Sequence, residues 1–450
     1  MTADHTPGPK SQNRFARHRK KTVLAVSVAM LLTIELCAYL VVVATGHSAL
    51  RYRYPYNRIV SGYTVFRNTP DFDTRSSTIK TDPQQPDVRF DAQGFIAADS
   101  VRLEKTDDTL RIFVVGGSTA IGAGQNQRYH AVHSYPDGIY SYPDSIAGRL
   151  QVFLEQKLPG RKIEVVTAAT YRRRFHQSVM HYMESLSRYA PDYVVNIDGQ
   201  NDVPSFASGT PFADVEGQML PAQIALLDEP SWLNHLSTYY VLSKAWDRLQ
   251  VQRTATMALP DAASPPLRSD YQSRRERYVR HAQRFLQIVD HYLAVLKSDQ
   301  TQCVFVLQPL LYRQSVDSTL TDRERRLAEV PLPDEEWLIL RYFFDDYLSD
   351  ALRKRLERQG AIYIDMGQSV ADRAASTETF TDYCHLTVDG NQFVGETIGR
   401  AIVQDLQTRL QPRVGNANVR DESDSRMLRF AGVRFAGSDH VANSIKLERR

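Results

Sequence analysis

The stretch LRIFVVGGST, residues 110–119, decides the fold class of this chain. It opens with a short, largely apolar run rich in β-branched residues, which Gly116 and Gly117 close. A run of this length that ends in a turn signal predicts a buried β-strand. Ser118 follows the glycines directly, so the sequence places a hydroxyl at the carboxyl end of the predicted strand.

Four further stretches repeat this pattern along the chain, and helical patterns separate them. Because short apolar strands joined by helices imply a parallel sheet covered on both faces, we predict an α/β fold with five parallel strands. The further strands begin near Ile163, Asp192, Cys303 and Ala361, and the helical patterns cover residues 143–158, 178–190, 275–297 and 334–360.

The regions around this core differ in composition. Residues 45–109 are polar with little periodicity and predict an extended arm that lies on the domain, while residues 110–411 form the domain itself. The stretch at about 205–269 is rich in Pro, Leu and Trp and predicts an insertion. Residues 412–450 are charged and weakly periodic, which predicts a loose tail.

The basic excess of the chain is confined to its start. Residues 1–21 contain six Lys or Arg and one acid, and the remaining chain has 49 basic and 51 acidic residues. Since no basic surplus remains outside this tail, the composition gives no support for a nucleic-acid partner.

The segment TVLAVSVAMLLTIELCAYLVVVA, residues 22–44, follows the basic tail. As a helix it would be about 34 Å long, enough to cross a bilayer core of about 30 Å. The positive charges on its N-terminal side predict a cytoplasmic tail and an extracytoplasmic domain. A cleaved signal peptide is the alternative, but its apolar core is usually shorter. Glu35 lies inside the span; protonation and a partner helix both remain open explanations.

Polar residues follow three of the predicted strands. Ser118 follows the first, Asn201 of the GQND sequence follows the third, and Asp382 and His385 follow the fifth. Because the carboxyl ends of parallel strands meet at one edge, these residues are expected together. Ser118 then suits a nucleophile, His385 its base and Asp382 the carboxylate that orients the base, while the amide of Asn201 suits an oxyanion donor. Each motif alone also fits an ordinary turn, cap or loop.

Taken together, these motifs resemble those of the SGNH hydrolases, also called GDSL-type esterases and lipases. The resemblance extends from about Leu110 to about Gln404. It makes VVGGST the nucleophile turn with Ser118, DGQND the block with Gly199 and Asn201, and DYCHLTVDGN the block with Asp382 and His385. It implies a three-layer α/β/α sandwich with a flavodoxin-like strand order.

One block departs from the family pattern. Family members usually have a glycine after the second strand, whose N–H serves the oxyanion hole. Here the run is TAAT, residues 167–170, and Ala169 is the best match. Ala169 keeps the N–H but does not readily take a positive φ. The resemblance thus implies three donors: the N–H groups of Ser118 and Ala169 and the side chain of Asn201.

Several other features have competing interpretations. The loop that begins at Gln127 holds many tyrosines and two histidines, which suits either ring contacts with a substrate or a self-packed surface loop; no further ligands support a metal at His130 and His133. The run Arg172–Arg174 suits a solvated charge run or attraction of an anion. No cofactor is expected. Cys303 and Cys384 fall at opposite ends of the sheet, so no disulfide is expected between them.

The resemblance and the predicted topology imply a membrane-anchored extracytoplasmic serine esterase that removes acyl groups, such as acetyl, from a cell-surface glycan. An O-acyltransferase that uses the same site is an alternative within the enzymes. A non-catalytic glycan-binding or assembly protein that keeps the fold is the alternative from another class. The oligomeric state is not indicated by the sequence.

Overall fold

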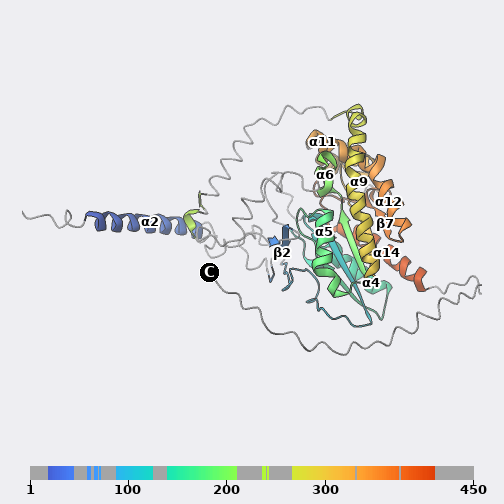
Figure 1. Ribbon diagram of the computed structural model, residues 1–450, viewed down its shortest axis with the longest axis horizontal. Coiled ribbons are helices and arrows are strands. Elements are labelled where there is room, and N and C mark those ends of the chain that lie inside the picture. The colour runs from blue at the N-terminus through green and yellow to red at the C-terminus, as the bar shows by residue number, and fades with distance from the viewer. Residues whose placement is uncertain are drawn as a thin grey trace, which may run out of the picture. The chain divides into compact units, whose positions relative to one another are not determined.

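The computed structural model describes most of the predicted domain and the N-terminal helix (Figure 1). The loop with His130 and His133, most of the insertion, and the tail at residues 412–450 lie outside the described residues. The described ranges are 19–44, 58–61, 65–68, 70–71, 88–124, 139–209, 236–239, 241–242, 266–329, 332–373 and 377–410.

A five-stranded parallel sheet forms the centre of the domain, as predicted. Its strand order is β4-β3-β5-β6-β7. In chain order this is 2-1-3-4-5, the flavodoxin-like arrangement. The strands are β3 (Thr109–Gly116), β4 (Lys162–Thr167), β5 (Tyr193–Asp198), β6 (Gln302–Leu307) and β7 (Ile362–Asp365).

The central strands are buried on both faces because helices cover both. All residues of β3 and β5 are buried. Since side chains alternate along a strand, Phe113 and Val115 point to one helical layer, and Ile112 and Val114 point to the other. This double burial explains why β3 reads as an almost continuous apolar run.

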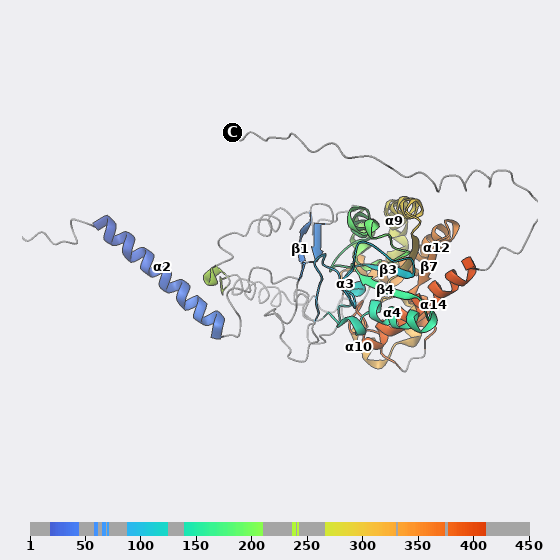
Figure 2. The same ribbon diagram turned by 90° about the horizontal axis from the view of Figure 1, so that it is seen from below.

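One helical layer is built around the long helix α9 (Arg268–Ser298), with α5 (Phe175–His181) and α12 (Ser349–Arg358) beside it. On the opposite side, α4 (Ile146–Lys157) packs on β4, and α14 (Val388–Leu410) contacts α4 through glycines. Figure 2 shows α9 and α4 on opposite sides of the strands. The three-layer α/β/α prediction is confirmed.

The predicted helix over residues 334–360 is interrupted. It forms α11 (Asp334–Leu338), a π-helical stretch at Ile339–Leu348, and then α12. The π-helical stretch buries Phe343 and Phe344 and carries Asp345 to the buried Arg313. A π-helical turn adds a residue per turn, which a periodicity argument does not anticipate.

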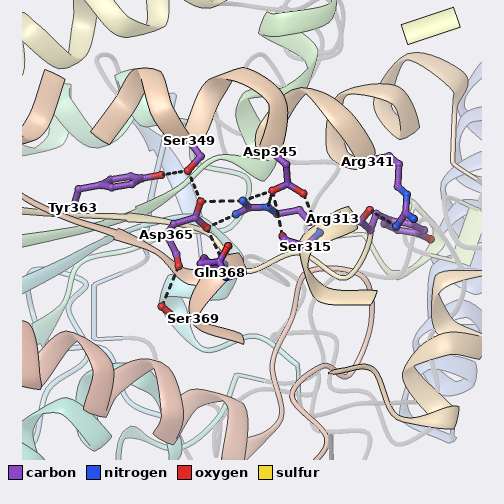
Figure 3. Close-up of polar contacts among 10 residues, drawn as sticks. Arg313, Ser315, Arg341, Asp345, Ser349, Tyr363, Asp365, Gln368 and Ser369 are labelled. Atoms are coloured by element: carbon purple, nitrogen blue, oxygen red, sulfur yellow. Dashed lines mark hydrogen bonds and ion pairs between the residues drawn. The ribbon is translucent and has the colours of Figure 1, made fainter. Parts of the chain in front are cut away.

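Arg313 forms a charged cluster beneath this stretch (Figure 3). Its side chain is only 2% exposed. Its Nε donates to Asp345 Oδ1 at 2.8 Å, and its Nη2 donates to Asp365 Oδ2 at 2.9 Å. Asp365 is the last residue of β7. The two ion pairs of Arg313 therefore link the loop after β6 both to β7 and to the π-helical stretch.

The region expected as an extended arm contains a short hairpin. Strands β1 (Arg58–Ser61) and β2 (Val65–Asn68) pair in antiparallel register. Asn68 Nδ2 donates to Ala169 O at 2.9 Å, and Ile96 forms an antiparallel bridge with Thr167. The arm therefore contacts the loop after β4. The glycine at position 62 of the sequence, between the two strands, was the available signal.

The expected membrane span falls within helix α2 (Arg19–Ala44). Among the described residues it is the helix that is long and apolar enough to cross a bilayer, with a mean hydropathy of 2.4 over its most apolar window. A signal sequence near the N-terminus has the same properties. Elsewhere, Cys303 and Cys384 are buried free thiols, as expected.

Candidate active site

Three loops bring the predicted site residues to the carboxyl edge of the sheet. Ser118 begins the short helix α3 (Ser118–Ile121) directly after β3. Asn201 lies in the turn after β5. The loop that leads into α14 carries Asp382 and His385.

Two glycines shape the turn before Ser118. Gly116 has φ 138°, and a Cβ there would lie 2.2 Å from the carbonyl oxygen of Ile197. At Gly117 a Cβ would lie 2.1 Å from Asn201 Nδ2. The missing side chains thus let the β5 strand and the Asn201 amide approach the backbone at Ser118.

Asp382 holds the ring of His385. His385 Nδ1 lies 2.6 Å from Asp382 Oδ2, and the N–H groups of Cys384 and His385 donate to Asp382 Oδ1 at 2.9 and 2.7 Å. Burial alone would raise the pKa of Asp382, but the charge of His385 and these hydrogen bonds lower it to about 2. The carboxylate therefore stays charged and fixes which ring nitrogen faces it.

The other ring nitrogen of His385 takes no part in the contact with Asp382. His385 Nε2 is buried and has no hydrogen-bond partner among the described residues. Burial opposes a charge on the ring, yet the interactions with Cys384 and with the Asp382 carboxylate raise the pKa of His385 well above 6.5. The expected bond between His385 and Ser118 is not formed, which is common for catalytic hydrogen bonds in unliganded sites.

Side chains that the sequence did not single out tie the His385 loop to the Ser118 turn. Thr119 Oγ1 donates to the carbonyl oxygen of Cys384 at 2.9 Å, and Gln308 Nε2 donates to Thr119 Oγ1 at 2.6 Å. Both side chains are buried. Thr119 follows Ser118 and Cys384 precedes His385, so this contact sets the spacing between the serine and the histidine. A glutamine at the end of an apolar strand was the available sequence signal for Gln308.

The GQND turn places the Asn201 amide beside the same backbone. Gly199 has φ 140°, a conformation that favours glycine. Asn201 Nδ2 donates one hydrogen to the carbonyl oxygen of Arg173 at 2.9 Å. Its second amide hydrogen is suited to a developing oxyanion near Ser118.

Ala169 does not carry the left-handed backbone that its match to a family glycine would suggest. It is fully buried and is absent from the described residues with positive φ, whereas Arg172, three positions later in the same loop, has φ 56°. This loop stays close to the nucleophile turn, because the Arg173 carbonyl oxygen lies 3.3 Å from the Cβ position of Gly117. The assignment of the Ala169 N–H to the oxyanion hole remains a prediction.

The interpretation of Arg172–Arg174 as a solvated charge run is wrong for two of its members. Arg173 and Arg174 are 2% and 4% exposed. Arg173 Nη1 lies 2.6 Å from the Ala168 carbonyl oxygen and 2.6 Å from His181 Nδ1. Burial lowers the pKa of Arg173 to about 10, and Asp198 opposes that shift. Arg173 thus stabilises this loop through hydrogen bonds on its buried side.

Cys384 is not arranged as a competing nucleophile. Its Sγ lies 3.8 Å from His385 Nδ1, the nitrogen that Asp382 already occupies. Burial raises the pKa of the thiol, which disfavours the reactive thiolate. Asp382, Cys384 and His385 also form a group of donors with metal-compatible spacing. A metal there would have to replace the short contact between Asp382 and His385.

Comparisons with known proteins give distant structural likenesses. No family model matches the chain, and no curated protein matches it. A putative GDSL-like lipase from Parabacteroides merdae is 12% identical, with a TM-score of 0.33, and the match covers 67% of this chain and 98% of that one. An acetylxylan esterase from Geobacillus stearothermophilus, solved as a catalytic mutant, is 11% identical, with a TM-score of 0.33 and coverage of 68% and 96%.

A further acetyl xylan esterase, AlAXEase, is 13% identical, with a TM-score of 0.33 and coverage of 65% and 98%. Identities and TM-scores this low carry no information on the arrangement of the site, which rests on this chain's own residues. The motifs, the strand order and the Asp382–His385 pair, whose loop Thr119 ties to the turn at Ser118, supply that argument. The chain resembles the SGNH hydrolases.

Proposed function

We propose that the protein is a serine esterase of the SGNH type, with Ser118 as nucleophile, His385 as general base and acid, and Asp382 as the group that orients the ring. The observation that carries the proposal is His385 itself. Its Nδ1 is held at 2.6 Å from Asp382, and its Nε2 is buried, with no partner among the described residues, at the edge where Ser118 begins α3.

The reaction follows from these positions. His385 Nε2 takes the proton of Ser118 as Oγ attacks the acyl carbonyl carbon. The amide of Asn201 and the backbone N–H groups predicted at Ser118 and Ala169 stabilise the oxyanion. The C–O bond to the leaving alcohol then breaks, and His385 returns the proton to that oxygen. Water, activated by the same nitrogen, attacks the acyl-enzyme and releases the acid and free Ser118.

The substrate and location form the finer part of the proposal. The apolar segment 22–44 of helix α2 and the positive charges on its N-terminal side support an anchored enzyme with its site outside the membrane. Membrane-anchored members of the resembled family often act on acyl groups of cell-surface polysaccharides. An acetylated glycan is therefore the proposed substrate, by analogy with the family.

The decisive experiment compares the full chain, purified in detergent, with its Ser118→Ala variant on p-nitrophenyl acetate. We expect kcat/KM to fall by at least about a thousandfold, because the acyl-enzyme cannot form. Ser298→Ala, an exposed serine at the far end of α9, is the matched control and should keep full activity. Equal rates for wild type and Ser118→Ala would exclude the esterase.

An acetylated oligosaccharide then separates hydrolysis from transfer. Release of acetate without a sugar acceptor supports the esterase. Acetyl transfer that requires an added sugar hydroxyl supports the acyltransferase. If the oligosaccharide binds unchanged, with no acetate released and no labelling of Ser118 by a fluorophosphonate, the non-catalytic glycan-binding alternative holds.

A further inference from the structure

Glu35 is an acidic side chain near the middle of the apolar helix α2. It lies about 13 Å from the Ala44 end, at about 1.5 Å per residue, so in a bilayer core of about 30 Å it falls close to the midplane. An ionisable group there is costly unless other groups satisfy its oxygens. The structure shows which groups do so.

Both carboxylate oxygens of Glu35 accept hydrogen bonds from one short segment of the predicted insertion. The N–H of Ser237 donates to Oε1, while the N–H of Thr238 donates to Oε2 at 3.1 Å and its hydroxyl donates to the same oxygen at 2.7 Å. Ser237 is 4% exposed. Two backbone groups and a hydroxyl are the donors expected for a carboxylate that is withdrawn from water.

The chain is long enough to bring this segment into the membrane while the domain stays outside. Residues 210–235 connect it to α6 (Val203–Ser208), and residues 243–265 connect it to α9. At about 3.3 Å per residue, each connection spans roughly 75 Å or more when extended. The stretch SWLNHLSTYYVLSKAW, residues 231–246, has no acidic residue and carries tryptophans, tyrosines and one lysine. Aromatic residues with a lysine are typical of the membrane interface.

We propose that the segment around Ser237 and Thr238 enters the outer half of the bilayer and binds Glu35 there. The insertion is then a second contact of the chain with the membrane, besides α2 itself. This explains an acid in the span without a separate partner protein. The inference rests on α2 being a retained membrane span and is independent of the esterase chemistry.

Disulfide trapping in native membranes tests the contact. The full chain carries Cys37→Ser together with Glu35→Cys and Thr238→Cys, while the buried Cys303 and Cys384 stay in place. Oxidation with copper phenanthroline should close a large loop, seen as a faster band on a non-reducing gel. The matched control pairs Glu35→Cys with Ser208→Cys, an exposed position at the end of α6, and should not cross-link. Absence of the 35–238 cross-link, or equal cross-linking of both pairs, overturns the proposal.

A second measurement keeps Glu35 and so does not depend on that variant folding. In the Cys37→Ser background, a cysteine at Thr238 should react with a membrane-impermeant maleimide at least tenfold more slowly than one at Ser208, until detergent is added. Equal rates in intact membranes contradict the proposal, as does mass spectrometry showing a chain cleaved after α2. Activity on p-nitrophenyl acetate in the same membranes reports separately on the esterase.

Discussion

Asp382 determines the state of His385. Its Oδ2 contacts the ring, and its Oδ1 accepts two backbone N–H groups of its own loop. The short Asp-x-x-His spacing makes this possible, because the turn brings the backbone donors and the ring to one carboxylate. Cys384 and the Asp382 carboxylate together keep the pKa of His385 above its ordinary value, so removal of the Asp382 charge should lower that pKa.

We predict that Asp382→Asn lowers the maximal kcat/KM and moves its acidic limb to lower pH. The base must be neutral, so wild-type activity rises as pH passes through the raised pKa of His385. Without the charge of Asp382 the pKa of His385 falls, and the acidic limb of the pH profile moves to lower pH with it. The loss at the optimum is expected to approach about 10⁴-fold, as in other triads. A pH profile from pH 5 to 10 measures both effects; an acidic limb that shifts upward contradicts the prediction.

Thr119 is predicted to act on the rate through position rather than through binding. Thr119→Val removes the hydroxyl that bonds the Cys384 carbonyl at 2.9 Å and accepts from Gln308. Because small misplacements of a catalytic group are costly, kcat should fall roughly tenfold to a hundredfold with KM unchanged. Gln308→Leu should also lower kcat with KM unchanged, but by a smaller factor.

Thr119→Ser is the matched control, since it keeps the hydroxyl. It should retain most of the wild-type kcat while Thr119→Val does not. Steady-state kinetics on p-nitrophenyl acetate make the comparison. A serine variant as slow as the valine variant would show that packing of the methyl group, and not the hydrogen bond, is what matters.

At the scale of elements, Arg313 joins parts of the fold that are distant in sequence. Figure 3 shows its guanidinium between Asp345 of the π-helical stretch and Asp365 at the end of β7. The loop that carries Arg313 also reaches the site, because Leu311 N–H donates to the Tyr383 carbonyl at 2.9 Å. The cluster therefore supports the loop that holds Asp382 and His385.

Arg313→Met should lower the free energy of unfolding by about 3–5 kcal/mol, because it leaves two partly buried carboxylates without their cation. Arg341→Met is the control in the same region. Arg341 pairs with the half-exposed Asp317, and loss of such a pair costs about 1 kcal/mol or less. Urea unfolding of the detergent-solubilised chain, followed by tryptophan fluorescence, compares the two. Equal losses of unfolding free energy in the two variants would contradict the prediction that the buried Arg313 cluster stabilises the fold more than an exposed ion pair.

At the scale of the whole molecule, the basic residues on the N-terminal side of the apolar segment predict its orientation in a membrane. Six basic residues precede the apolar segment 22–44, and the rest of the chain has no basic excess. This asymmetry favours a cytoplasmic N-terminus.

A reporter that is active only outside the cytoplasm, fused after Arg450, should therefore be active. Replacing the basic residues among 14–21 with glutamine should reduce that activity, because the orientation signal is weakened. The same fusion on a chain that lacks the apolar helix is the control and should be inactive. A fusion that works only in the cytoplasm would reverse the topology.

The sequence by itself determined the five strands, their parallel arrangement and the edge at which Ser118, Asn201, Asp382 and His385 lie. These features follow from local periodicity and from the rule that strand ends share an edge. The Asp382 and His385 contact was also within reach of the sequence, since it spans three positions.

Only the tertiary structure decided which polar groups are buried and what satisfies them. Thr119 meets the Cys384 carbonyl across 265 positions, and Gln308 meets Thr119 across 189. Arg173, which the sequence favours as a solvated charge, is buried against His181. A buried polar group is stable only where folding brings it a partner. Periodicity shows which residues face the interior. The partner of a buried polar group, however, is set by the packing of segments that are far apart in the sequence.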